Sequence, residues 1–133
     1  MTLDSTLAFA QTAIPDCLAV GLVDLQTGML LAVKTVDSHP QEVLDLVAAA
    51  TGDIFQGQNV VAIENLFKRT RGVTSTDHYF NEIIINSQNL IHVFQRGRKN
   101  PSVVLVVVCR IKANLGMVLA KSRGELSKVE AKV

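Results

Sequence analysis

Tryptophan is absent from this sequence, and its 133 residues include one tyrosine and five phenylalanines, although 48% of them are hydrophobic. A buried core must therefore be built from valine, leucine, isoleucine and alanine. No apolar run approaches the roughly 20 residues that a membrane-spanning helix needs, so we expect no membrane insertion. The N-terminal segment carries Asp4 and no basic residue, unlike a secretory signal, and we expect a cytoplasmic protein.

The sequence has two cysteines, which are too few for a disulfide scaffold. Cys17 and Cys109 lie in apolar segments, and buried reduced thiols are the first expectation. A redox pair is the alternative if their strands are antiparallel neighbours, although such disulfides are uncommon in a reducing compartment. His39, His78 and His92 are dispersed and form no Cys/His cluster of zinc spacing, so we expect no metal and no cofactor.

Charge of one sign is not in excess, because 13 basic and 12 acidic residues leave a net charge of +1. The signs are separated along the chain, since residues 1–64 carry a net charge of −7 and residues 65–133 carry +8. This separation predicts two differently charged surfaces on one domain.

What the sequence does contain is an uninterrupted apolar segment of seven residues, Val103–Cys109. A strand with one wet face would alternate, so this segment predicts a strand buried on both faces. Asn114 follows as a natural cap for a last helix. The pattern indicates a sheet that helices cover on both sides.

Turn and cap residues divide the first half of the chain. Pro15 ends a helix that begins near Leu3, and Gly28 allows a tight turn between strands over residues 17–24 and 29–36. A long helix follows Ser38 and Pro40. Its apolar stripe is Val43, Val47, Ala50 and Ile54. Gly52 and Gly57 weaken this helix, and we expect a bend or break near residues 56–58.

The second half predicts three strands, over residues 77–86, 90–94 and 102–110, joined by short turns that require antiparallel pairing. The element order is α-β-β-α-β-β-β-α. We therefore expect an α/β (α+β) fold with a five-stranded antiparallel sheet, the first and last helices on one face and the long helix on the other. The polar segment 124–133 is expected to be a fraying tail.

Two local motifs suggest catalysis and are better explained by structure. Residues 52–59 have the glycine spacing of a phosphate-binding loop but lack its lysine and follow a helix, so we expect a weak point in a helix. Ser75, Asp77 and His78 are neighbours on an extended chain, whose side chains alternate in direction and do not converge as a triad. We expect a non-enzymatic protein.

Six basic residues flank the hairpin over residues 77–94 and are expected at one end of the sheet: Lys68, Arg69, Arg71, Arg96, Arg98 and Lys99. They could contact an acidic protein, a phosphate or a nucleic acid. We favour a solvated cluster and expect no nucleic-acid partner, because no aromatic platform accompanies the bases.

The strand over residues 77–86 lies at an edge of this topology and is unusually apolar for one. Exposed apolar edges invite pairing with another chain. We expect self-pairing across a two-fold axis beside the long helices. The predicted interface residues are Tyr79, Phe80, Ile83, Ile84, Val47 and Ile54.

The chain resembles the roadblock/dynein light chain family, and within it the bacterial MglB type. The resemblance rests on the element order, the long central helix, the hairpin over residues 77–94 and four short segments: Val20–Asp24, Thr27–Gly28, Leu105–Val108 and Ala113–Gly116. It covers about residues 3–123 and implies a roadblock-like domain with a profilin-like three-layer sandwich, dimers, and no catalytic residues.

The resemblance also implies a scaffold or regulator of a Ras-like small GTPase, with the paired central helices as the partner face. Carried over to this chain, Val43, Val47, Ile54, Val61 and Phe67 would partly form the dimer interface. A ligand-sensing or signalling domain of similar shape is the alternative. Two alternatives stay open at this point: whether the protein activates the GTPase or only anchors it, and whether it forms a homodimer or a heterodimer.

Overall fold

The computed structural model describes residues 1–37, 41–74, 78 and 80–133, and only the backbone of residues 41–43. Four helices and five strands occupy them in the order α1 (Leu3–Ala13), β1 (Cys17–Asp24), β2 (Met29–Thr35), α2 (Gln41–Gln56), α3 (Gln58–Thr70), β3 (Glu82–Asn86), β4 (Leu90–Arg96), β5 (Val103–Arg110) and α4 (Leu115–Glu130). In the part of the chain so described, no helix is both long and apolar enough to cross a membrane.

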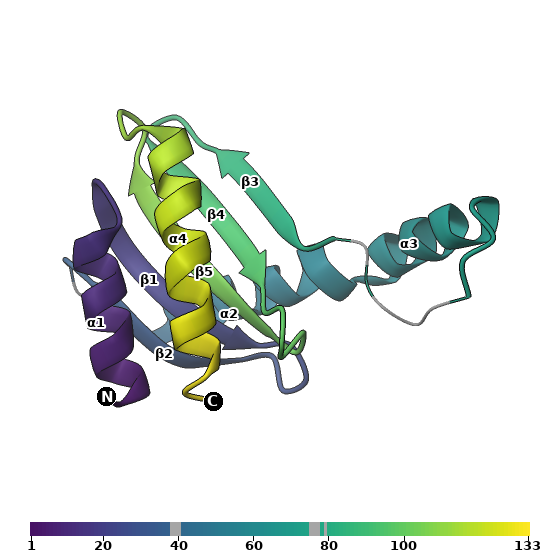
Figure 1. The fold of residues 1–133 in the computed structure, drawn as a ribbon, viewed down its shortest axis with the longest axis horizontal. Coiled ribbons are helices and arrows are strands. Elements are labelled where there is room, and N and C mark those ends of the chain that lie inside the picture. The colour runs from purple at the N-terminus through teal and green to yellow at the C-terminus, as the bar shows by residue number, and fades with distance from the viewer. Residues whose placement is uncertain (38–40, 75–77, 79) are drawn as a thin grey trace.

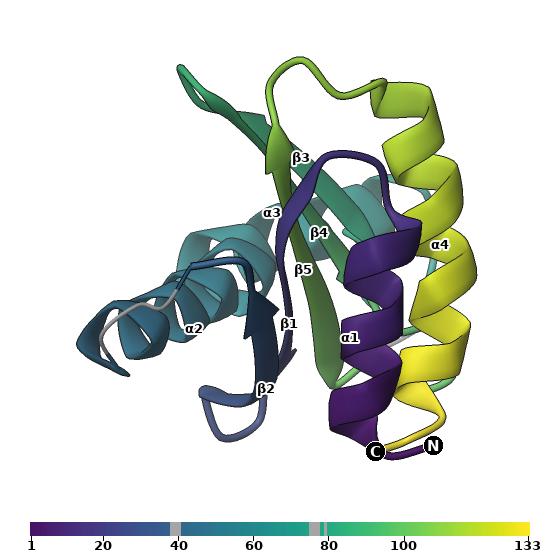
Figure 2. The same ribbon diagram turned by 90° about the vertical axis from the view of Figure 1, so that its left-hand side faces the viewer.

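The strands form one antiparallel sheet in the order β2-β1-β5-β4-β3. β5 is central and β3 is at an edge, as predicted. Helices α1 and α4 cover one face of the sheet and α2 covers the other, which confirms the expected three layers (Figures 1 and 2).

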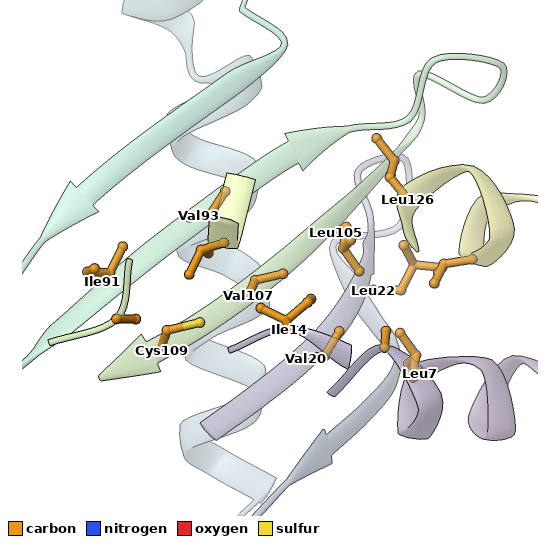
Figure 3. Close-up of a cluster of buried hydrophobic side chains, with 14 of the residues drawn as sticks. Leu7, Ile14, Val20, Leu22, Ile91, Val93, Leu105, Val107, Cys109 and Leu126 are labelled. Carbon is orange, nitrogen blue, oxygen red and sulfur yellow. The ribbon is translucent and has the colours of Figure 1, made fainter. Parts of the chain in front are cut away.

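The larger core lies between the sheet and the α1/α4 layer (Figure 3). Leu22 and Leu105 contribute from neighbouring strands, and Leu7 of α1 and Leu126 of α4 close over them, all nearly without exposure. Alternate residues of β5 enter this core and the opposite one, which explains why the strand is apolar throughout.

The smaller core lies under α2, where Ala48 and Phe55 pack on Val23 and Val104. The predicted stripe of α2 is displaced by one position. The buried positions are Ala48, Thr51 and Phe55, whereas Val47 and Ala50 are exposed, and Ile54 is half-buried against the core. Val43 and the predicted cap over residues 38–40 lie outside the described side chains.

The predicted helix break is confirmed at Gly57, which separates α2 from α3 and takes the cap position of α3 with φ −60° and ψ 157°. A Cβ atom at Gly57 would stand 2.5 Å from the carbonyl oxygen of Asp53, so only glycine fits here without a shift. α3 projects away from the body of the molecule beyond β3 (Figure 1).

Other predictions differ from the structure. The short turn between β3 and β4 sets a register in which Ile83 pairs with Phe94 and Ile85 with His92. β3 begins at Glu82, five residues after the predicted start. The backbone of Phe80 forms hydrogen bonds with the side chains of Glu64 and Arg96 and not with the backbone of a neighbouring strand. The polar tail is also wrong for residues 124–130, since α4 continues to Glu130 and buries Leu126 and Val129.

Candidate functional site

The free edge of β3 is the first part of a candidate protein-binding surface. β4 pairs with β3 on one side, and no described strand lies on the other. Ile84 and Ile85 are exposed along this edge. Exposed apolar edges of this kind are usually covered by a partner.

Glu82 does not protect this edge, because its carboxylate is engaged elsewhere. Arg123 of α4 donates to both oxygens, with Nη2–Oε1 at 2.6 Å and Nε–Oε2 at 3.0 Å, and Gln95 donates to Oε2 at 3.0 Å. The Arg123 guanidinium holds the pKa of Glu82 below its usual range. The one charge that could deter pairing is therefore neutralised within the chain.

α3 supplies the second part of the surface. Ile63, Leu66 and Phe67 are large, apolar and about half exposed, and Leu66 retains 50% of its accessible area. They lie near the far end of a helix that touches the body chiefly through α2 and projects past the sheet edge (Figure 1). Together with Ile85 of β3, which is exposed and shares the α2 face of the sheet with Ile83, and with exposed Leu46 and Val47 of α2, we call these residues the apolar edge surface.

An apolar groove continues from this surface onto the α2 face of the sheet. It has a volume of about 300 Å³ and lies between α2, at Leu44 and Val47, and the strands, at Val106 and Val108. At the groove Val106 is buried in the smaller core, whereas Val108 remains partly exposed.

Two buried charges position the segment that leads into β3. Glu64 of α3 is 2% exposed and accepts a hydrogen bond from the backbone N–H of Phe80 at 3.2 Å, while its other oxygen lies 3.0 Å from Nδ1 of His78. These contacts join α3 to the chain before β3. Sequence analysis missed Glu64, because its partners lie 14 and 16 residues away and no local pattern marks them.

Arg96 at the end of β4 is 3% exposed and is not a surface charge. It donates to the carbonyl oxygens of Phe80 at 2.9 Å and of Pro101 and Phe55 at 3.3 Å, and its guanidinium stands over the Phe55 ring. Burial lowers the pKa of Arg96, and the charge of Glu64 acts in the opposite direction. Arg96 therefore ties α2, β4 and the start of β3 together.

The predicted basic cluster does not form as one patch. Arg96 is internal, Lys68, Arg69 and Arg71 are at the far end of α3, and Arg98 and Lys99 are in the turn after β4. Figure 1 shows these two ends well apart. The basic residues do not gather because α3 projects outward, so that the start of the loop to β3 is far from the end of β4.

The predicted interface residues are placed unequally. Ile84 and Val47 are exposed, whereas Ile83 and Ile54 are half-buried against the smaller core and Phe80 is half-buried. Tyr79 lies outside the described residues, as do Ser75 and Asp77 of the rejected triad. His78, the third member of that triad, contacts Glu64.

A polar cavity of about 640 Å³ lies beside α4, where β3 begins and β4 ends. Arg96, Arg98 and Arg123 line it together with Glu82 and Gln95. Gln95 is 1% exposed, and its Oε1 has no hydrogen-bond partner among the described residues. Over the same residues, no three His, Cys, Asp or Glu side chains gather as they would around a metal ion.

Comparison with known proteins identifies the fold. A structure described as MglB with tetrameric arrangement matches with a TM-score of 0.71 at 18% identity, covering 96% of this chain and 85% of the other. Myxococcus xanthus MglB matches with a TM-score of 0.70 at 19% identity, covering 98% and 96%.

A Roadblock/LC7 domain from Streptomyces avermitilis matches with a TM-score of 0.71 at 12% identity, covering 98% of this chain and 97% of that domain. No family model and no curated protein matches the sequence. The chain thus has the roadblock/LC7 fold, which confirms at the level of fold the resemblance drawn from the sequence.

Proposed function

We propose that the chain is a cytoplasmic, non-enzymatic homodimer that binds a Ras-like small GTPase and regulates its nucleotide cycle or its localisation. The observation that carries the proposal is the apolar edge surface. Ile63, Leu66 and Phe67 lie on a helix that extends beyond β3, on the α2 side of the sheet (Figures 1 and 2).

A two-fold axis beside β3 accounts for this arrangement. Pairing of β3 with β3 of a second copy would continue the sheet past its present edge and place the partner's sheet over α3. The apolar side chains of α3 would then be buried on the sheet face that α2 leaves open, next to the groove at Val108. One two-fold arrangement would thus pair the free β3 edge of each copy and bury the α3 side chains of each copy on the other.

The GTPase partner is supported by the fold together with the resemblance to regulators of Ras-like GTPases. In such a dimer the α2 helices of the two copies form one continuous outer layer, which is suited to binding a globular partner. The chain would act by contact, as a scaffold or as a modulator, and would supply no catalytic group.

The decisive test is binding to Ras-like GTPases of the same organism, beginning with any encoded by a neighbouring gene. Purified GTPase is loaded with GDP or with a non-hydrolysable GTP analogue, and binding is measured by titration calorimetry. We expect clearly tighter binding of one nucleotide state. Equal or absent binding of both states by every candidate GTPase would contradict the proposal.

The polar cavity favours a second candidate function, the sensing of a small anionic ligand. Arg98 could bind an anion there, while the unpartnered Oε1 of Gln95 could accept a hydrogen bond from the same molecule. A thermal-shift screen with a metabolite library tests it, with Arg98→Ala as the matched variant. A stabilising hit that this variant loses would support ligand sensing.

A further inference from the structure

Cys17 and Cys109 face each other across neighbouring strands. Cys17 of β1 pairs with Cys109 of β5. The backbone N–H of Arg110 donates to the carbonyl oxygen of Asp16 at 3.0 Å, so the hydrogen bond lies outside the cysteine pair. In such a non-hydrogen-bonded pair the Cα atoms are about 4.5 Å apart and the side chains are close, which falls within the range that a disulfide spans.

A bulge in β1 creates this pairing. Ala19 pairs with Val108 and Cys17 with Cys109, so Leu18 is an additional residue on the β1 side. Without it, Cys17 would share the sheet face of Ala19, since side chains two residues apart in a strand point the same way. The bulge instead turns Cys17 toward the α1/α4 core, where it packs beside the buried cluster. Figure 3 shows Cys109 within this cluster.

The residue before Cys17 also has an uncommon conformation. Asp16 has φ 53°, the one positive φ among the described non-glycine residues. Aspartate tolerates this region better than most side chains, but it is still a departure from the preferred backbone. Two local irregularities, one on each side of Cys17, thus accompany its placement against Cys109.

The two thiols differ in access and in chemistry. Cys17 is partly exposed, whereas Cys109 is fully buried. A hydrogen bond with the Cys109 thiol lowers the pKa of Cys17, and the same contact, together with burial, raises the pKa of Cys109. An accessible thiol with increased thiolate character beside a second thiol is the arrangement of oxidation-sensitive cysteines.

We propose that Cys17 and Cys109 form a reversible oxidation site for hydroperoxides, in which Cys17 reacts first and Cys109 closes a disulfide between β1 and β5. The site is separate from the apolar edge surface, because β1 and β5 lie on the far side of β4 from β3. It therefore does not depend on the proposed function.

The reaction balances with the peroxide as the two-electron oxidant. The Cys17 sulfur attacks one peroxide oxygen, the O–O bond breaks, and Cys17 becomes a sulfenic acid while the other oxygen leaves as water or alcohol. The Cys109 sulfur then attacks the Cys17 sulfur. The S–O bond breaks, the S–S bond forms, and the second oxygen leaves as water with the Cys109 proton. A small dithiol reverses the product by exchange.

The full chain tests this directly, because it contains no other cysteine. Reduced protein is treated with hydrogen peroxide, quenched by acid and alkylated, then analysed by intact mass and peptide mapping. We expect both thiols to disappear together, the monomer to lose the mass of two hydrogen atoms, and a dithiol to restore it. Stable sulfinic acid, or a disulfide between two molecules as the main product, would overturn the proposal.

Two variants separate the roles of the thiols, with circular dichroism confirming that each is folded. Cys109→Ala should stop at the sulfenic acid of Cys17, which dimedone traps. In Cys17→Ala, the rate of Cys109 oxidation should be at least roughly tenfold lower than the rate of Cys17 oxidation in the wild type, because Cys109 is buried. Equal oxidation of Cys109 in this variant would contradict the order of reaction. The peptide map of the wild-type chain decides the proposal even if a variant fails to fold.

Discussion

Asn114 shows how one side chain positions an element. Its Oδ1 accepts a hydrogen bond from the backbone N–H of Met117 at 3.1 Å, which satisfies one of the free donors at the start of α4. Asn114→Ala should lower the free energy of unfolding by about 1 kcal/mol, measured by urea denaturation. Asn114→Asp keeps the acceptor and should retain most of the stability. An equal loss in both variants would show that the cap is not the cause.

The ion pair between Glu82 and Arg123 predicts a pH-dependent contribution to stability. The pKa of Glu82 is lower in the folded chain than its ordinary value of 4.5, chiefly because Arg123 donates to its carboxylate. A lowered folded pKa stabilises the protein above the unfolded pKa, and this contribution is lost as the pH falls through the folded pKa.

Arg123→Ala should therefore lower the urea midpoint slightly at pH 7, because an exposed pair contributes little. The difference from wild type should shrink as the pH falls below 4.5 and vanish once Glu82 is protonated. Lys121→Ala is the control, since it removes a positive charge from the same helix. A difference that is independent of pH would disprove the role of the ion pair.

These two residues also differ in how well the sequence reveals them. Asn114 stands four residues after the end of a buried strand and directly before α4, so local chemistry predicts its role. Glu82 and Arg123 are 41 residues apart, and only the packing of α4 beside β3 brings them together. The same holds for the contacts of Glu64 with His78 and Phe80, and for those of Arg96 with Phe80 and Phe55.

At the scale of elements, the break between α2 and α3 is set by a single glycine. Gly57→Ala should lower the free energy of unfolding by roughly 1–3 kcal/mol, because its Cβ would overlap the carbonyl oxygen of Asp53 and force the backbone to move. Gly52→Ala is the matched control, five residues earlier in α2. Its Cβ would meet no atom within 4 Å, so this variant should gain about 0.5–1 kcal/mol.

Thermal and urea unfolding of both variants give the comparison. Opposite signs would show that Gly57 is required for the close approach of the backbone, whereas Gly52 is not. A stabilising effect of Gly57→Ala would mean that α2 and α3 can join into one straight helix. In that event the direction of α3, and with it the apolar edge surface, would change.

The elements themselves were largely predictable where turn chemistry is local. β1 has the predicted bounds, and α1 ends one residue before Ile14, next to Pro15. The late start of β3 was not predictable, because it depends on contacts with Glu64 and Arg96 that are distant in sequence. The continuation of α4 to Glu130 was not predictable either, because it depends on the packing of Leu126 in the larger core. The displaced stripe of α2 had a different cause, since the sequence pattern allowed two adjacent stripes and the sheet selected one.

For the whole molecule, the sequence predicted the five-stranded antiparallel sheet, the layers and the edge position of β3. The resemblance also implied an interface at Val47 and Phe67, and both side chains are exposed in the structure, although their role in an interface stays a prediction. It did not place the six basic residues, because their predicted gathering assumed a compact loop between the central helix and β3. The direction of α3 follows from the bend at Gly57, which residue patterns locate but do not orient.

The proposed homodimer predicts an asymmetric response of the two sheet edges to charge. Leu66 on α3 is 50% exposed and Met29 on β2, at the opposite edge, is 63% exposed. Neither side chain is part of a buried core cluster, so aspartate at either position should leave the melting of the monomer nearly unchanged. In the proposed dimer, however, Leu66 becomes buried against the second copy, where an unpaired charge is costly.

Sedimentation velocity at micromolar concentration should therefore show a dimer for the wild type and for Met29→Asp, and a monomer for Leu66→Asp. At least a tenfold weaker association of Leu66→Asp corresponds to about 1.4 kcal/mol. If both variants stay dimeric, the interface does not include α3. If the wild type is a monomer at micromolar concentration, the proposed homodimer is wrong, and Ile63, Leu66 and Phe67 are not buried by a second copy.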